Sequence, residues 1–259
     1  MNRRQSLGGG ARGFIPLKGR NVGVETPTYR RITSEVGWAF SPTKSKIAFT
    51  LAEVLITLGI IGVVAALTLP SLMAKHRKVQ IVTSLKKFYS TFSQAVQYSQ
   101  VRNGDFSQIP PPVKDHDPDS LADWWEIYFR KEFKDQRTYT KNGWFLVDFA
   151  DGSGAGIKSM SKTEINMQVI YCVNLRECLD KDFNVAASAG GATDGKNSFT
   201  FILYKNKLGP VKTDLSRDEY INNSQYGCAV DTGDFAHRYC SSLIMHDGWE
   251  IKDDYPVKL

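Results

Sequence analysis

A run of twenty uncharged residues, 54–73, most strongly limits what this chain can form. At about 1.5 Å per residue, a helix of that length crosses the ~30 Å hydrocarbon core of a bilayer. A buried core helix is rarely apolar on all sides for so long, and a cleaved secretory signal has a shorter apolar region. The run therefore predicts a single transmembrane helix.

The sequence before this run has a different composition. Residues 1–48 hold nine lysines and arginines against two glutamates and are rich in glycine, proline and serine, which predicts a disordered basic leader. The formal net charge of +6 belongs to this leader, because residues 49–259 hold 24 basic and 25 acidic side chains. The charge therefore gives no support for a nucleic-acid partner.

One carboxylate, Glu53, lies at the start of the apolar region. A carboxylate costs about 2.5–3.5 kcal/mol at the centre of a membrane helix and less near its edge, so it calls for a partner. Its surroundings are distinctive: residues 46–56 read KIAFTLAEVLI, in which a basic flank, Ala48 and Phe49 precede the glutamate. With the apolar helix that follows, residues 44–74 resemble the cleavage and methylation signature of type IV prepilins and pseudopilins.

The resemblance implies processing followed by assembly. A prepilin peptidase would cut between Ala48 and Phe49 on the cytoplasmic side and methylate the new amino terminus, and Glu53 would pair with the Phe49 ammonium of a neighbouring subunit. The other implied partners are pilin or pseudopilin subunits, the inner-membrane assembly machinery and membrane lipid. The implied location is the bacterial inner membrane, with a cytoplasmic N-terminus, and then a periplasmic or extracellular filament.

Two features depart from the family pattern. Ala48 stands where the family most often has glycine, which is expected to slow the cut without preventing it. The leader is also longer than usual, which suggests that translation starts further along the sequence. Both departures concern processing and leave the apolar helix unaffected.

Small residues and a proline interrupt the apolar helix. Gly59 and Gly62 permit close approach of another helix, although glycine is also common in ordinary transmembrane segments. Pro70 removes a backbone donor and predicts a bend. Beyond the membrane half, 49–74, apolar residues recur at helical spacing, so 75–104 is expected to be an amphipathic continuation that packs on a head domain.

Residues 105–259 predict an α+β head. Strands are expected over 144–149, 167–173 and 199–204, and helices over 119–134 and around 236–244. The glycine-rich segment 152–156 and residues 206–209 are typical of loops and turns. A capping box at 120–123 predicts where the first of these helices begins. The expected fold is pilin-like: a long N-terminal transmembrane and amphipathic helix packed on an antiparallel sheet.

The four cysteines, Cys172, Cys178, Cys228 and Cys240, all follow the apolar region. An even number in an exported domain favours disulfides, and three pairings are open. The short loops favour Cys172 with Cys178 and Cys228 with Cys240. Zinc is the alternative, but the spacings match no common zinc finger.

No motif indicates an enzyme. The histidines lack a metalloprotease spacing, and no serine lies in a G-x-S-x-G elbow. The acidic segments 115–117 and 231–234 could bind Ca²⁺ but are more typical of solvated loops, so no cofactor is expected.

The sequence therefore predicts a non-catalytic, pilin-like filament subunit. A pseudopilin of a type II secretion or DNA-uptake system is the close alternative, since it carries the same N-terminal signature. A membrane-anchored extracytoplasmic ligand-binding or enzymatic domain is a more distant one.

Overall fold

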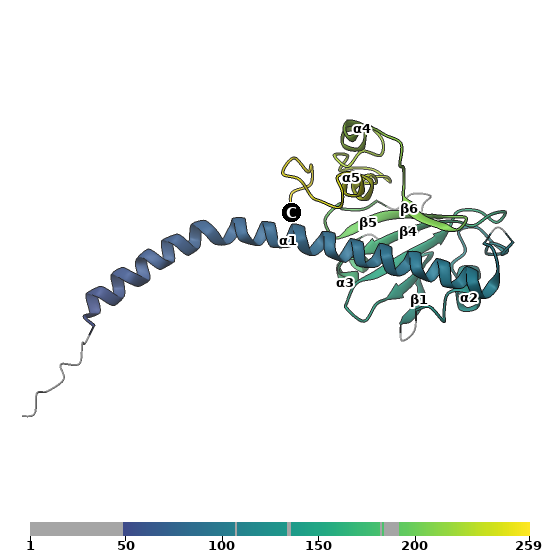
Figure 1. Cartoon of the computed structure of the whole chain (residues 1–259), viewed down its shortest axis with the longest axis horizontal. Helices are drawn as coiled ribbons and strands as arrows, with labels where there is room; N and C mark the ends of the chain where they lie inside the picture. Colours follow the sequence, from purple (N-terminus) through teal and green to yellow (C-terminus); the bar gives the residue numbers. More distant parts are fainter. Residues whose placement is uncertain (1–48, 107, 134–135, 182, 184–191) are drawn as a thin grey trace, which may run out of the picture. The chain divides into compact units, whose positions relative to one another are not determined.

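The computed structural model describes residues 49–259 except 107, 134–135, 182 and 184–191, so the predicted leader lies outside the described residues. Residues 51–259 form one compact unit. Figure 1 shows its elements, which in chain order are α1 (Leu51–Asn103), α2 (Pro118–Tyr128), β1 (Arg137–Lys141), β2 (Trp144–Asp148), β3 (Gly154–Ser159), β4 (Asn166–Cys172), α3 (Leu175–Lys181), β5 (Ser198–Tyr204), β6 (Lys207–Pro210), α4 (Arg217–Asn222) and α5 (Cys240–His246).

The six strands form one antiparallel sheet in the order β1-β2-β3-β4-β5-β6, so each strand pairs with its neighbour in sequence. Alternate residues face opposite sides of such a sheet. Val169 and Phe201, which are partners in the register, belong to the main core beside α1. Ile170 on the same strand faces a second core, completed by Leu175 and Phe183. The long helix and the antiparallel sheet confirm the α+β class.

The second half of α1 packs on the sheet through one apolar stripe. Its buried side chains recur at helical spacing and are Ile81, Leu85, Phe88, Phe92, Ala95, Val96 and Ser99. The helix ends at Asn103, and Gly104 follows with φ +91°, a backbone conformation that glycine adopts at little cost. This stripe is the amphipathic pattern seen in the sequence, and the helix runs through both halves without interruption.

The prediction of a loop at 152–156 is wrong, because Gly154 and Gly156 lie in β3. A Cβ on Gly156 would stand 2.3 Å from Cε1 of Phe183, and one on Gly154 would stand 2.7 Å from Cδ2 of Leu175. Both contacts are too close for real atoms. The glycines therefore make room for side chains packed on the second face of the sheet.

Other elements differ from expectation at their ends or were missed. β1, α3 and α4 were not predicted, and the turn expected at 206–209 is largely the edge strand β6. α2 ends at Tyr128, before the expected end at 134. The last helix starts at Cys240, later than the expected position near 236. Short helices and edge strands carry too few residues for a clear apolar period.

The C-terminal segment is fixed by a cluster of charges. Arg217 at the start of α4 donates from Nε to Asp247 at 2.9 Å and from Nη1 to Asp254 at 2.7 Å. Lys252 donates from Nζ to the same Asp247 oxygen, also at 2.9 Å. Burial opposes ionisation of Asp247, but these hydrogen bonds outweigh it, so the pKa of its carboxyl lies below the ordinary value.

This cluster predicts acid sensitivity. A folded pKa below the unfolded one stabilises the protein above the unfolded value of about 3.9, and the gain is lost as pH falls toward the folded value. Arg217→Gln is therefore expected to destabilise the protein at about pH 7, with a deficit that shrinks at about pH 3. Urea unfolding of both proteins at each pH measures this deficit. A deficit independent of pH would show that Arg217 contributes through packing rather than through charge.

Candidate assembly surface

The predicted cleavage and assembly residues lie at the start of α1. Glu53 is in its first turn, and Phe49, just before the helix, is 78% exposed. Ala48 lies outside the described residues. An acidic side chain in the first helical turn is favoured by the helix dipole, which gives Glu53 a local reason to be helical in addition to any role between chains.

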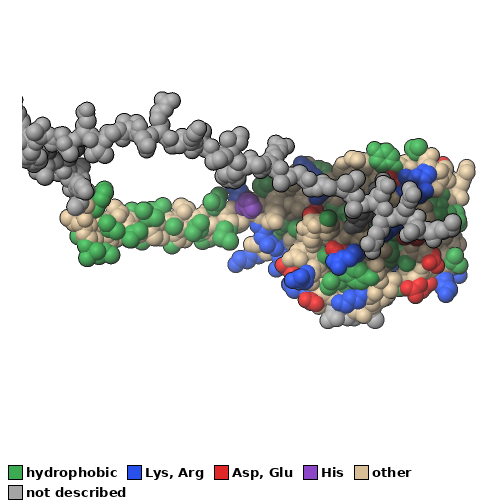
Figure 2. All heavy atoms as spheres, turned by 90° about the horizontal axis from the view of Figure 1, so that it is seen from below, with side chains coloured by type: hydrophobic (Ala, Val, Ile, Leu, Met, Phe, Trp, Pro, Cys, Tyr) green, Lys and Arg blue, Asp and Glu red, His purple; other side chains and the backbone are tan. Residues whose placement is uncertain are grey.

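The first half of α1 carries a continuous exposed apolar surface, seen in Figure 2 as the green helix leading away from the head. From residue 51 to residue 80 no side chain is buried. Its large exposed side chains include Leu51, Leu55, Ile56, Leu58, Ile60, Ile61, Val63, Val64, Leu67, Leu69, Leu72 and Met73. Soluble proteins rarely expose so large an apolar patch, so lipid or another protein is expected to cover it.

This helix is long and apolar enough to cross a membrane, and it is the single helix with that property among the described residues. Three hydroxyl side chains in its apolar half bond to backbone carbonyls of the same helix. Thr57 donates to the carbonyl of Val54 at 3.0 Å, and Thr68 donates to that of Val64 at 2.9 Å. Ser71 similarly bonds Thr68 within one turn. Such internal bonds suit hydrocarbon, where water cannot satisfy polar groups.

Gly59 and Gly62 are not required by packing within the chain. A Cβ at either position would meet nothing within 4 Å, so both glycines leave open surface where a second helix could approach closely. α1 continues through Pro70, although proline cannot donate to the carbonyl four residues earlier. The structure places all three residues on the exposed half of α1.

Basic residues follow directly after the apolar surface, and Figure 2 shows blue side chains where the green helix meets the head. Lys78 donates to Oδ1 of Asp253 at 2.7 Å and to the carbonyl of Lys252 at 3.3 Å. The hydrogen bond from Lys78 holds the pKa of Asp253 below its ordinary value. The C-terminal segment is thus attached to α1 just beyond the apolar surface.

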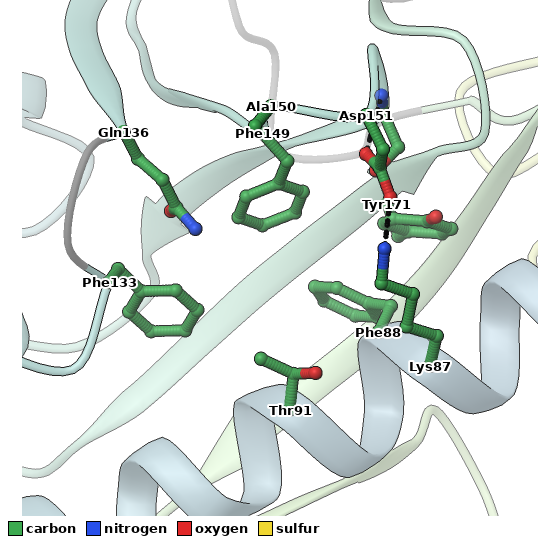
Figure 3. Close-up of a pocket in the computed structure, with 10 residues that line it drawn as sticks. Lys87, Phe88, Thr91, Phe133, Gln136, Phe149, Ala150, Asp151 and Tyr171 are labelled. Atoms are coloured by element: carbon green, nitrogen blue, oxygen red, sulfur yellow. Dashed lines mark hydrogen bonds and ion pairs between the residues drawn. The ribbon is translucent and has the colours of Figure 1, made fainter.

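Further along α1, aromatic rings join the helix to the sheet (Figure 3). Phe88 stacks on Tyr171 with ring centroids 4.3 Å apart. Beside this stack lies a pocket of about 370 Å³, also lined by Phe133 and Phe149. At its edge Lys87 binds Oδ2 of Asp151 at 2.6 Å. These contacts fix the head on the helix.

That ion pair also affects ionisation. Burial raises the pKa of Asp151, but hydrogen bonds from Lys87 and Ser153 more than compensate, so the pKa is lowered overall. The carboxylate therefore stays charged at neutral pH. It acts as a fixed attachment point for α1.

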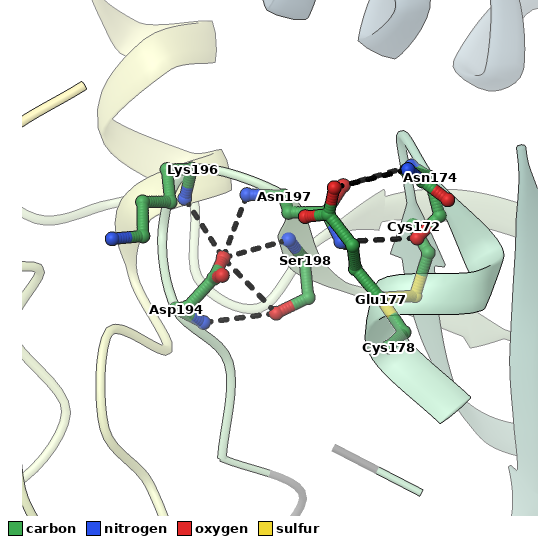
Figure 4. The surroundings of a disulfide bond; sticks show 8 residues. All are labelled: Cys172, Asn174, Glu177, Cys178, Asp194, Lys196, Asn197 and Ser198. Carbon is green, nitrogen blue, oxygen red and sulfur yellow. Dashed lines mark hydrogen bonds between the residues drawn. A yellow bond between two sulfur atoms is a disulfide. The ribbon is translucent and has the colours of Figure 1, made fainter. Parts of the chain in front are cut away.

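Two disulfides cross-link the head. Their pairing is the one that the short loops between the cysteines predicted. The structure joins Cys172 to Cys178 and Cys228 to Cys240. Figure 4 shows the first in its surroundings. Disulfides of this kind are typical of proteins that fold outside the reducing cytoplasm.

A polar network supports the first disulfide. Asn197 Oδ1 accepts from the backbone of Asn174 at 2.8 Å, and its amide nitrogen returns a bond to the Asn174 carbonyl at 3.0 Å. Asp194 Oδ1 accepts from the backbone nitrogens of Asn197 and Ser198 at 2.6 and 2.9 Å. Asp194 therefore fixes the loop before β5.

The acidic segments considered for Ca²⁺ do not gather in the structure. Within the described part of the chain, no three histidine, cysteine or acidic side chains stand close enough to hold a metal ion. Asp117 instead caps α2 by accepting from the backbone of Ser120 at 3.2 Å. Trp124 and Trp125 on that helix are buried in the main core.

Sequence reasoning missed the ion pairs that fasten the head to α1. Lys78 and Asp253 are 175 residues apart in the chain, and Lys87 and Asp151 are 64 apart. Each is an ordinary exposed charge when read locally. Only the fold brings the partners together.

Comparison with known proteins gives one family match. Residues 71–259 match a family described as "Family of unknown function (DUF6613)". The match covers the outer part of α1 and the whole head but not the cleavage motif. Neither the curated proteins nor the solved structures include a match to this chain.

Proposed function

The chain belongs to DUF6613, a family without an assigned activity, and we propose that it is a pilin-like structural subunit that a prepilin peptidase processes and that assembles into a filament through α1. The exposed apolar half of α1, with Glu53 in its first turn, carries this proposal. The pilin-like character of the fold belongs to the same proposal. It rests on a long N-terminal helix that continues directly from an apolar half into a half packed on an antiparallel sheet.

The apolar half of α1 must be shielded from water both before and after assembly. Before assembly, lipid of the bacterial inner membrane surrounds it. In the filament, the same surface packs against the helices of other subunits, and the open positions at Gly59 and Gly62 allow close approach. The apolar half of α1 therefore anchors the subunit in the membrane before assembly and packs against other subunits in the filament.

Processing supplies the charge that guides assembly. Cleavage between Ala48 and Phe49 creates a new ammonium group at the end of an apolar segment. That cation and the Glu53 carboxylate of a neighbour lose hydration on leaving water, and each recovers favourable electrostatics best by meeting the other. Such a pair would set the axial register of one subunit against the next.

The head contains disulfides, as exported domains commonly do. Two disulfides cross-link the head internally. The ion pair of Lys78 with Asp253 and that of Lys87 with Asp151 fix the head to α1. In the proposed topology the N-terminus is cytoplasmic and the head lies outside. The inner-membrane assembly machinery would then extract the subunit into a periplasmic or extracellular filament.

Mass spectrometry of the protein isolated from its cells tests this proposal. The mature N-terminus is expected to be N-methylated Phe49, and Ala48→Leu is expected to block the cut because a bulky residue replaces the small one. Gly59→Ala serves as the matched control, since it adds one methyl group away from the cleavage site. An intact leader, or a cut near Ala74, would overturn the assignment.

A further inference from the structure

A groove of about 750 Å³ lies between the edge strand β6 and the α4–α5 region of the head, elements that Figure 1 shows together at one side of the sheet. Its size falls in the range of small-ligand sites in proteins. β6, β5 and the segment after β6 contribute one wall, and α5 contributes the other. Tyr89 of α1 also lines the groove, and the other lining residues belong to the head.

The groove is cationic. Two lysines, Lys207 and Lys212, line it, while none of the described lining residues is a carboxylate. Neither lysine forms an ion pair with a described residue. Residues 49–259 as a whole carry slightly more acidic than basic side chains, so this local excess of positive charge is not a property of the chain at large. A groove of one sign attracts ligands of the other.

Three carboxylates next in sequence to groove residues or bonded to one are already engaged. Glu164 accepts from the hydroxyl of Tyr204 at 3.1 Å, and Asp214 accepts from Thr213 at 2.6 Å. Asp247, beside His246, is held by Arg217. None of these three lines the groove. The hydrogen bond from Thr213, and then the charge of Lys212, lower the pKa of Asp214, so Lys212 interacts with this carboxylate at longer range without an ion-pair contact.

A buried hydroxyl in the groove retains unused hydrogen-bonding capacity. Ser242 on α5 is 2% exposed, lines the groove, and its Oγ has no hydrogen-bond partner among the described residues. Buried polar groups in native proteins are nearly always paired. An unpaired hydroxyl on a residue that lines a groove is a candidate partner for a ligand bound there.

Aromatic rings supply the apolar part of the site. Tyr204 is 44% exposed, and its hydroxyl bond to Glu164 holds the ring in place. Tyr89 and Tyr220 also line the groove. A ligand that suits these groups has an apolar face for a tyrosine ring, hydroxyls for Ser242 and a negative charge for the lysines.

We propose that this groove binds a carboxylated saccharide. A sugar ring offers C–H groups on its faces and hydroxyls at its edge, and a uronic-acid carboxylate provides the charge that Lys207 and Lys212 attract. An inorganic anion would use the lysines but not the tyrosine, and a neutral sugar would leave the lysines unused. The site does not depend on filament assembly.

Isothermal titration of the full-length chain in detergent with trigalacturonate tests the proposal. Saturable binding is expected, weakened by about tenfold or more in Lys207→Gln/Lys212→Gln because charge-assisted hydrogen bonds are lost. Tyr204→Ala is also expected to weaken it. Lys131→Gln, an exposed lysine remote in sequence from the groove, is the matched control and should bind as the parent does.

Ser242→Ala separates a ligand-binding role from a structural one. If its hydroxyl serves the ligand, affinity falls while stability toward urea is unchanged or higher, because a buried unpaired group has been removed. The absence of saturable trigalacturonate binding, or equal affinity in the double lysine variant, would overturn the proposal. So would equally tight binding of inorganic phosphate or of neutral trigalactose.

Discussion

Glu53→Ala is expected to leave the chain inserted in the membrane and to abolish its incorporation into filaments. Removing a carboxylate from the end of an apolar helix favours insertion, by up to the ~2.5–3.5 kcal/mol that such a group costs at the membrane centre. In the filament the change would leave the Phe49 ammonium of the neighbour without its partner. Breaking a buried ion pair costs about 3–5 kcal/mol, enough to stop addition of a subunit.

The measurement compares membrane and sheared-filament fractions from cells that make each variant. Glu53→Gln, which keeps the size and polarity of the side chain, is expected to fail nearly as completely, whereas Glu53→Asp should retain part of the incorporation. Thr57→Ala, one turn along α1, is the control and should assemble normally. Normal assembly of Glu53→Ala would remove the proposed role of the carboxylate.

Phe92→Ala is expected to be the most damaging single change in the head. Phe92 is 1% exposed, and its ring centroid lies 5.5–6.1 Å from those of Phe88, Phe133 and Trp125. It therefore joins α1 to α2 and to the segment that follows α2. Truncating a buried phenylalanine costs about 3–5 kcal/mol, a large part of the stability of a typical domain.

Urea unfolding of the full-length protein in detergent, followed by tryptophan fluorescence, measures this loss. Tyr98→Ala is the matched control, because Tyr98 is 59% exposed on the same helix. It should change the free energy of unfolding by about 0.5 kcal/mol or less. Similar losses in both variants would mean that Phe92 does not anchor the helix.

The sequence predicted the elements with the strongest pattern. α1 was recognisable because its first half is a long uncharged apolar run and its second half has apolar residues at helical spacing. β2, β4 and β5 were recognisable because each combines β-branched and aromatic residues. β3 was missed because Gly154 and Gly156 are typical of loops. Only the positions of Leu175 and Phe183, brought there by later parts of the chain, explain glycine in a strand.

The start of α2 was predicted at 119, one residue late, but its cap was placed wrongly. The capping box expected at 120–123 is not the one used, because Asp117 caps the helix and Pro118 takes its first position. Both are ordinary signals for the start of a helix. The signal at Asp117 and Pro118 is also readable from the sequence, but the prediction relied on the box at 120–123 alone.

The candidate assembly residues were readable from sequence, whereas the groove beside β6 was not. Ala48, Phe49 and Glu53 form one continuous motif. Lys207, Lys212 and Ser242 come from separate segments, and none of them is unusual in its local context. Their common property, a shared cavity without a carboxylate, exists only in the folded head.

The sequential order of the sheet bears on how the head reaches its final form. Each strand pairs with the strand made just before it, so no strand waits for a distant segment. Local pairing favours rapid folding, so the sheet can extend one strand at a time along the chain. The last contacts to form would be those of the C-terminal segment, where Asp253 reaches back to Lys78. We expect this contact between the C-terminal segment and α1 to form only after the rest of the head has folded.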